Sequence, residues 1–289
     1  MIGFLQRLFG GERPSAAAPR RTTKPPLPEA ELETFKTWFL QQTCPAIALT
    51  PDASLPIAAT GSRLGGPAWL AAGEDWPRDR RGVPLEFIAQ LDCTDCRELG
   101  GYPDTGIIQF FVARNDLYGA DFDDPAGAAM LVRRCDIAAA GALVSPPPLA
   151  LVAGLECSDC SPFENLAVRA TGIGLRPTLI TDRIDRTVMA AEQRVMGLYE
   201  RYDATALEGF LRSEAKARPP RHHSGGYPVF TQDDVRFRPA FADFDHVLLR
   251  LTSDTYLMWG DAGECLFLIR SEDLARGDLS RVAYSWDCY

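Results

Sequence analysis

The stretch His222–Asp234, HHSGGYPVFTQDD, gathers side chains of the kinds that hydrolytic sites use. A histidine held next to a carboxylate can act as a general base. We therefore consider a hydrolase-like site in which His222 or His223 meets Asp261 and Asp287. The chain has no G-x-S-x-G nucleophile elbow, which weakens this hypothesis. The alternative is that the histidines anchor a loop through hydrogen bonds to the backbone.

Two C-x-x-C pairs, CTDC and CSDC, provide the second chemical signal. Four thiolates are a common ligand set for a tetrahedral structural zinc, so Cys93, Cys96, Cys157 and Cys160 form a candidate metal site. The gap between the pairs is longer than in a compact zinc ribbon, but distant pairs can meet in a folded chain. One alternative is that Cys93 is a small core residue. A redox pair is another, although no thioredoxin-type helix follows either motif.

Aromatic side chains near the glycine-rich loops are candidate ligand contacts. Trp76, Tyr227 and Trp259 lie in or beside these loops, and large rings often line clefts there. The predicted ligand-binding set consists of these three residues together with the two histidines and two aspartates named above. Tryptophans in such positions also serve as core plugs, and the sequence leaves both interpretations open.

Composition narrows the classes of function. The 289 residues carry a net charge of −9, and 46% of them are apolar. An acidic chain without a basic face argues against nucleic-acid binding. No run approaches the roughly 20 apolar residues of a membrane span. The start MIGFLQRLFGG lacks a secretory signal pattern, so we expect a cytoplasmic protein whose eight cysteines are reduced.

Residues 1–28 differ from the rest and are predicted to form a flexible basic tail. The tail begins with a short amphipathic segment, whose apolar side chains fall on one side of a helix: Ile2, Phe4, Leu5, Leu8 and Phe9. A cationic segment rich in proline and alanine follows. One interpretation is weak contact of residues 1–24 with an anionic membrane surface. The other is that this end is a frayed terminus, or a short helix that docks on the body of the protein or on a partner.

Residues 29–289 are predicted to form a single domain. Apolar and aromatic side chains recur at helical spacing from about 29 to 42. A second helical region covers about 187–217, with a break near Asp203. Short β-branched or aromatic runs predict a series of strands, the last of them weaker: Leu85–Asp92, Gly106–Ala113, Ala128–Cys135, His246–Ser253, Glu264–Arg270 and the run SRVAYSW near the C-terminus.

Two parts of the chain show the same order of motifs. A glycine pair, Gly65-Gly66 or Gly225-Gly226, precedes a strand, a turn with aspartate and glycine, and a second strand. We predict an internal duplication, with pseudo-repeats at about 60–150 and 220–289 joined by the second helical region. The expected fold is α+β, with internally duplicated antiparallel β-sheets and covering helices. Paired glycines permit φ > 0 at tight turns, which explains much of the opening stretch without catalysis.

Several ordered motifs resemble the YwqG-like family of bacterial proteins. They are GGPAWLAAGEDWP, PLEFIAQLD, GIIQFFV, HHSGGYP, MWGDAGECLFLI and the final WDC, and they span about Thr60 to Cys288. The resemblance implies an α+β fold with internal duplication and no established activity. The chain departs from the expected pattern at Arg250, where the family suggests glutamine, and at Cys93 and Cys96, where it suggests aliphatic residues.

These observations favour a non-enzymatic binding or interaction protein over an enzyme. Its loops between the two halves would contact a protein partner or a small ligand. A neutralising partner for a bacterial toxin is one variant, because it would suit an acidic body. The alternative is a hydrolase-like enzyme with a His/Asp site in the cleft between the halves.

Overall fold

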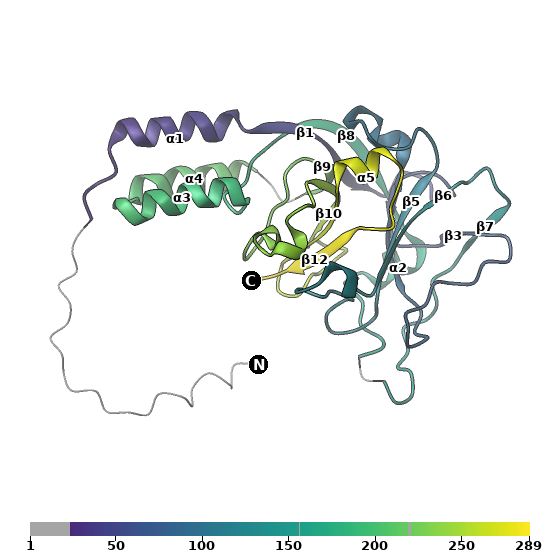
Figure 1. The fold of residues 1–289 in the computed structure, drawn as a ribbon. Coiled ribbons are helices and arrows are strands. Elements are labelled where there is room, and N and C mark those ends of the chain that lie inside the picture. The colour runs from purple at the N-terminus through teal and green to yellow at the C-terminus, as the bar shows by residue number, and fades with distance from the viewer. Residues whose placement is uncertain (1–23, 156, 219–220) are drawn as a thin grey trace, which may run out of the picture.

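The computed structural model describes residues 24–155, 157–218 and 221–289 and has an α+β architecture (Figure 1). Ten strands form one antiparallel sheet in the order β12-β11-β10-β9-β1-β8-β2-β4-β5-β6. Their bounds are β1 (Thr43–Asp52), β2 (Arg63–Leu64), β4 (Glu86–Asp92), β5 (Ile107–Val112), β6 (Met130–Cys135), β8 (Ile173–Arg183), β9 (His222–Gly225), β10 (His246–Thr252), β11 (Glu264–Ile269) and β12 (Ala283–Asp287). A small second sheet pairs β3 (Ala68–Ala71) with β7 (Gly141–Val144).

The strands predicted from the β-branched and aromatic runs are confirmed, five of them to within about two residues at each end, whereas the weaker run near the C-terminus becomes a strand only from Ala283. The strand β8 is not evident from the sequence. It contains Gly174 and Pro177, which weaken a strand signal, and much of its outer half is exposed. The long antiparallel pairing of β8 with β1 supplies the backbone hydrogen bonds that make it a strand.

The strand order repeats on the two sides of the central β1–β8 pair. β1 is followed outward by β9, β10, β11 and β12, and β8 by β2, β4, β5 and β6. The inner hairpin of each side carries one register irregularity, between Phe87 and Ala89 in β4 and between Val247 and Leu249 in β10. A bulge bends a strand and increases its twist.

The main core lies between the two halves of the sheet. It draws buried apolar side chains from β1, β4, β5 and β8 and from β10, β11 and β12. Phe110 of β5 and Phe267 of β11 meet there with ring centroids 4.9 Å apart. The sheet therefore bends so that its two halves pack against each other.

The glycine pairs hold turns that other residues would strain. Gly65 has φ +57° and Gly225 has φ +68°. A Cβ at Gly65 would lie 2.6 Å from the carbonyl oxygen of Val168, and one at Gly225 would lie 2.8 Å from Leu99. Both glycines therefore serve backbone geometry, as the sequence predicts.

Three helices form an arm at one end of the sheet (Figure 1). They are α1 (Glu29–Gln41), α3 (Met189–Arg201) and α4 (Thr205–Ala217), and they share an apolar cluster separate from the main core. We call these three helices the helical arm. The predicted break is confirmed at Asp203, whose side chain accepts a hydrogen bond from the Thr205 amide at 3.1 Å. The expectation that these helices cover the sheet is wrong, because their apolar faces pack on one another.

Two shorter helices, α2 (Leu166–Thr171) and α5 (Ser271–Ala275), lie beside the sheet. In the described part of the chain, no helix combines the length and apolarity needed to cross a membrane. The amphipathic segment and the membrane contact predicted for residues 1–24 fall almost entirely outside the described residues, so both stay predictions.

Candidate functional site

His222 is buried in β9 and has structural partners on both ring nitrogens. Its Nδ1 accepts a hydrogen bond from the Thr252 amide at 3.2 Å, and its Nε2 lies 3.1 Å from Asp254 Oδ2. The acidic partner is therefore Asp254, a residue that the sequence does not single out. These contacts tie β9 to the end of β10 and leave no free nitrogen for a substrate.

His223 is equally buried and belongs to a chain of charged groups. Its Nδ1 donates to the Gly225 carbonyl at 2.9 Å, and its Nε2 accepts from Arg250 at 3.3 Å. Arg250 also pairs with Glu264. Burial, reinforced by the positive charge of Arg250, lowers the pKa of His223 to about 3. Burial raises the pKa of Glu264 to about 7, although Arg250 opposes this.

The predicted aspartates are not gathered around the histidines. Asp261 is exposed in the turn before β11, where its carbonyl accepts a hydrogen bond from the Tyr289 amide. Asp287 accepts hydrogen bonds from the amides of Thr231 and Gln232, each at 2.9 Å. Burial raises the pKa of Asp287. These contacts give the hydrolase-like alternative no support.

The predicted aromatic contacts divide between core and arm. Trp76 is buried and donates to the Leu85 carbonyl at 2.9 Å, and Trp259 is fully buried against Tyr118. Both are core plugs. Tyr227 is half-buried against the apolar cluster of the helical arm, and its amide donates to Asp182.

The two C-x-x-C pairs contact different parts of the molecule. Cys93 and Cys96 are fully buried, and burial raises their pKa values to about 11 and about 12. Cys157 is exposed and Cys160 is half-buried, and burial together with Cys157 raises the pKa of Cys160. Among the described residues, no three histidine, cysteine, aspartate or glutamate side chains cluster in a way that could hold a metal ion. The four-thiolate zinc site stays a prediction for metal analysis of the purified protein.

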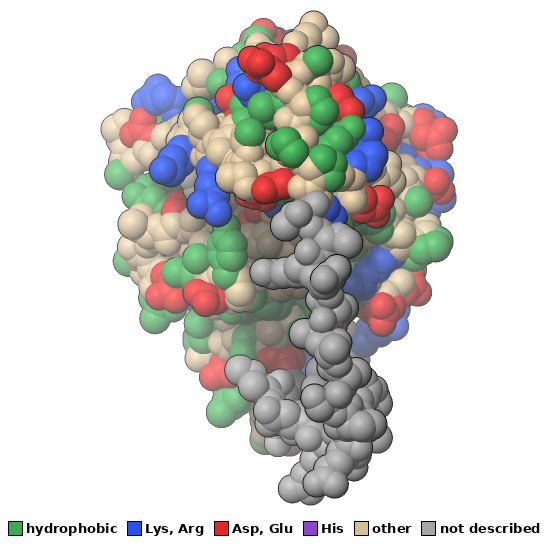
Figure 2. Space-filling view, turned by 90° about the vertical axis from the view of Figure 1, so that its left-hand side faces the viewer, with side chains coloured by type: hydrophobic (Ala, Val, Ile, Leu, Met, Phe, Trp, Pro, Cys, Tyr) green, Lys and Arg blue, Asp and Glu red, His purple; other side chains and the backbone are tan. Residues whose placement is uncertain are grey.

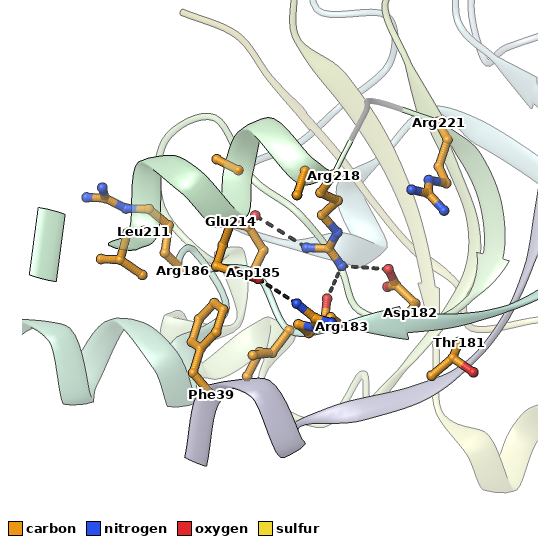
Figure 3. A pocket seen from close by; sticks show the side chains of 13 residues that line it. Phe39, Thr181, Asp182, Arg183, Asp185, Arg186, Leu211, Glu214, Arg218 and Arg221 are labelled. Atoms are coloured by element: carbon orange, nitrogen blue, oxygen red, sulfur yellow. Dashed lines mark hydrogen bonds and ion pairs between the residues drawn. The ribbon is translucent and has the colours of Figure 1, made fainter. Parts of the chain in front are cut away.

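A group of ion pairs connects the helical arm to the sheet (Figure 3). Arg218, just after α4, donates to Asp182 of β8 at 2.7 Å and approaches Asp185 at 3.3 Å. Arg183 of β8 reaches back to Glu214 of α4 at 2.5 Å. Burial alone would raise the pKa of Asp182, but the charge and hydrogen bonds of Arg218 outweigh it and lower the pKa. The hollow between these side chains is small, at 200 Å³.

Two larger hollows adjoin each other between α3 and the C-terminal half of the sheet. Their volumes are 440 Å³ and 600 Å³, and they share Glu192, Phe230 and Gln232. We call them together the arm groove. Viewed from the end of the arm, the surface beneath it is hollowed and mixes apolar with charged side chains (Figure 2). The loop between β9 and β10 and the C-terminal residues complete the walls.

The walls of the arm groove carry exposed apolar side chains. Leu117, Met196, Phe237 and Tyr289 are exposed by 43%, 49%, 45% and 83%. They lie around the two hollows although they come from separate segments of the chain. Exposed apolar residues that gather around a cavity mark interaction surfaces more often than scattered ones do.

The arm groove is also acidic. Its carboxylates outnumber its two arginines, Arg186 and Arg238, and are Asp185, Glu192, Asp233, Asp234, Glu264 and Asp287. Several are paired within the protein, as Asp234 is with Arg236. Glu192 differs, because its buried Oε2 finds no hydrogen-bond partner among the described residues. Burial and the charges of Asp233 and Asp234 raise the pKa of Glu192.

The opening stretch of the sequence does contribute to this groove, but through other residues than its histidines. Phe230, Gln232, Asp233 and Asp234 line it, whereas His222 and His223 lie inside the sheet. Of the predicted ligand-binding set, Asp287 lines the groove. The sequence signal for the arm groove was the loop VFTQDD, in which an aromatic residue is followed by two adjacent acidic residues.

The fold and the groove together define an α+β domain with a hollowed, acidic and partly apolar surface. The family model described as Domain of unknown function (DUF1963) matches residues 62–288, which is most of the chain. The chain therefore belongs to this family, and the expected membership of an uncharacterised family is confirmed to that extent. No curated protein matches the chain.

Proposed function

We propose that this protein binds another polypeptide, and that the arm groove receives a segment of that partner carrying apolar and cationic side chains. One observation carries the proposal: four exposed apolar side chains and an excess of carboxylates surround the same pair of adjoining hollows.

The chemistry of the groove defines the partner. Apolar side chains of a bound segment would cover Met196 and Phe237 and remove their surface from water, which favours binding. A lysine or arginine of the segment would compensate the negative charges of Glu192 and Asp233. The charge of Asp233 is close enough to Glu192 to raise the pKa of that carboxyl. Hollows of this size accommodate a few side chains each, as helix-in-groove recognition requires.

A toxin-neutralising role is one form of this function, in which the bound segment belongs to a basic bacterial toxin. A cytoplasmic location would suit such a role. The groove constrains the partner's chemistry, and the biological identity of the partner follows only from isolating it.

Peptide display tests the proposal. The immobilised full chain is expected to enrich peptides that combine leucine or aromatic residues with lysine or arginine. Combined Met196→Asp and Phe237→Asp substitutions should weaken the enriched peptides at least tenfold. Combined Leu151→Asp and Leu179→Asp substitutions are the matched control, because both residues are exposed and lie outside the groove. Equal binding by the groove variant and the wild type would refute the proposal.

We also propose that the two halves of the sheet arose by internal duplication, as the YwqG-like resemblance suggests. The mirrored strand order, the corresponding bulges and the contact between Phe110 and Phe267 support this origin. Relatives whose two halves are more alike in sequence than these would strengthen it.

A further inference from the structure

We infer that residues 1–9 of this chain dock in the arm groove of the same molecule and compete there with the partner. This inference rests on the proposed function, because it assigns a second occupant to the same groove. Residues 1–23 lie outside the described part of the chain, and their sequence and the position of Lys24 point to the groove.

The described chain begins at the wall of the groove. Lys24 donates a hydrogen bond from Nζ to the carbonyl of Tyr199, and Tyr199 lines the 440 Å³ hollow. The next residues stay beside the turn between α3 and α4. The Pro25 carbonyl accepts from the Asp203 amide at 2.8 Å, and the Leu27 amide donates to the Asp203 carbonyl at 3.1 Å. The described chain therefore starts at the edge of the groove.

The linker is long enough to reach both hollows. Residues 10–23 separate the amphipathic segment from Lys24, and an extended chain spans roughly 3.3 Å per residue, or roughly 45 Å in all. Along α3, Glu192 lies about 10 Å from Tyr199 at about 1.5 Å per residue. A relaxed linker covers this distance.

The segment and the groove are complementary. Residues 1–9 contain apolar side chains at helical spacing that match the exposed side chains of the groove, whose members are Leu117, Met196, Phe237 and Tyr289. Residues 1–23 carry four arginines and one glutamate, whereas carboxylates outnumber arginines in the groove. Arg7, within the segment, would approach Glu192 or Asp233.

Tethering makes weak docking sufficient. A short flexible linker gives an attached segment an effective concentration in the millimolar range. A segment with a dissociation constant of about 1 mM would therefore occupy the groove about half of the time. An external partner must displace it, so the tail lowers the affinity for that partner and selects against weak binders.

Photo-crosslinking tests the location. A photo-crosslinking amino acid replaces Phe9 in the full chain, and mass spectrometry maps the product. The expected result is a monomeric product joined to peptides containing Met196, Phe237 or Tyr289, and its loss in the variant with Met196→Asp and Phe237→Asp. The variant with Leu151→Asp and Leu179→Asp should crosslink like the wild type.

Three outcomes would overturn the inference. Products joined outside the groove would exclude docking there. Dimeric products at low protein concentration would place the segment on a second copy. Binding of the tail to phosphatidylserine vesicles without any crosslink to the groove would favour the membrane contact instead.

A competition measurement separates this inference from the proposed function. The variant with Leu5→Asp and Leu8→Asp, in the full chain, should bind a display-selected peptide about two- to tenfold more tightly than the wild type does. Equal affinities would overturn tail docking while leaving the proposed function intact. A groove crosslink from position 9, with no peptide enriched by either chain, would support docking of the tail but refute both the proposed function and the competition with a partner.

Discussion

The two halves of the sheet place different chemistry on the same backbone pairing. In the first half, Arg63 of β2 pairs in register with Gln90 of β4. In the second half, His223 of β9 pairs with Arg250 of β10. The first member of each pair lies close to a glycine turn: Arg63 is two residues before Gly65, and His223 is two residues before Gly225.

The hydrogen-bond partners of these side chains differ more between the two halves than the backbone pairing does. Gln90 donates to the carbonyls of Ala59 and Gly61, each at 3.0 Å. Arg63 likewise donates to the carbonyls of Ala58 and Pro67. In the first half these side chains mainly fix the adjoining loop through bonds to backbone oxygens, and Gln90 also accepts a hydrogen bond from the Gln109 side chain.

In the second half, the corresponding side chains bond to other titratable side chains. His223, Arg250 and Glu264 form a buried series, and Glu264 lines the arm groove. One pairing framework can therefore brace a loop through backbone oxygens in one half and form an ion-paired layer beneath the arm groove in the other. Arg250 is also one of the positions at which the sequence departs from its family resemblance.

Removing the arginine should produce the largest difference between the halves. Arg250→Ala is expected to lower the free energy of unfolding by about 3–5 kcal/mol, because it leaves Glu264 buried without its cation. Gln90→Ala should cost about 1–2 kcal/mol, because it loses hydrogen bonds between neutral groups. Urea unfolding at pH 8, where Glu264 is charged in the folded protein, measures both. Equal losses of unfolding free energy in the two variants would show that Arg250 and Gln90 stabilise the sheet to the same extent.

The pH dependence of stability should reverse between two variants. His223 has a pKa lowered from 6.5 to about 3, so its contribution is lost as pH falls below 6.5. Glu264 has a pKa raised from 4.5 to about 7, so its contribution is lost as pH rises towards 7. Each slope reaches at most about 1.4 kcal/mol per pH unit.

Between pH 4.5 and 6.5 the two slopes oppose each other in the wild type. Relative to it, His223→Asn should gain stability as the pH is lowered, and Glu264→Gln should lose stability. Denaturant unfolding in this range tests the sign. Parallel curves for all three proteins would mean that neither group titrates differently in the folded and unfolded states.

The smallest effect concerns the contact that the halves share. Phe110→Leu and Phe267→Leu should each cost about 1–2 kcal/mol and agree to within about 0.5 kcal/mol, because the rings occupy corresponding positions and touch. The double variant should cost less than the sum, since the first change already removes the ring contact. A strongly unequal pair of costs would argue against matched roles for the two rings.

The sequence predicts the elements of this fold well and the candidate site poorly. Periodicity locates the three helices of the arm, the six predicted strands and the break at Asp203, because each depends on local spacing, whereas β8 and β9 are missed because their strand form depends on pairing with β1. The groove depends on α3, the loop after β9 and the C-terminal residues meeting in space. No local pattern states which distant segments will adjoin.

The histidines illustrate the same limit. A pair of histidines beside a serine indicates chemistry only if their nitrogens are free, and neither sequence nor spacing shows their partners. The structure assigns these nitrogens to a backbone amide, a carbonyl, Asp254 and Arg250. Exposure, rather than residue type, is what separates them from Phe237, which carries no reactive group and lies at the surface.

The two central strands, β1 and β8, extend beyond the strands that flank them, and this has a mechanical consequence. β9 pairs with β1 only from Ala46 to Leu49, whereas the pairing of β1 with β8 continues to Thr43 and Arg183. A two-stranded ribbon thus leads from the sheet to the three helices, and such ribbons twist more readily than wide sheets. Bending of that ribbon would change the spacing between α3 and the opposite wall of the arm groove, with the hydrogen bonds of Arg218 as the restraint. We therefore expect the width of the arm groove to vary without a change in either core.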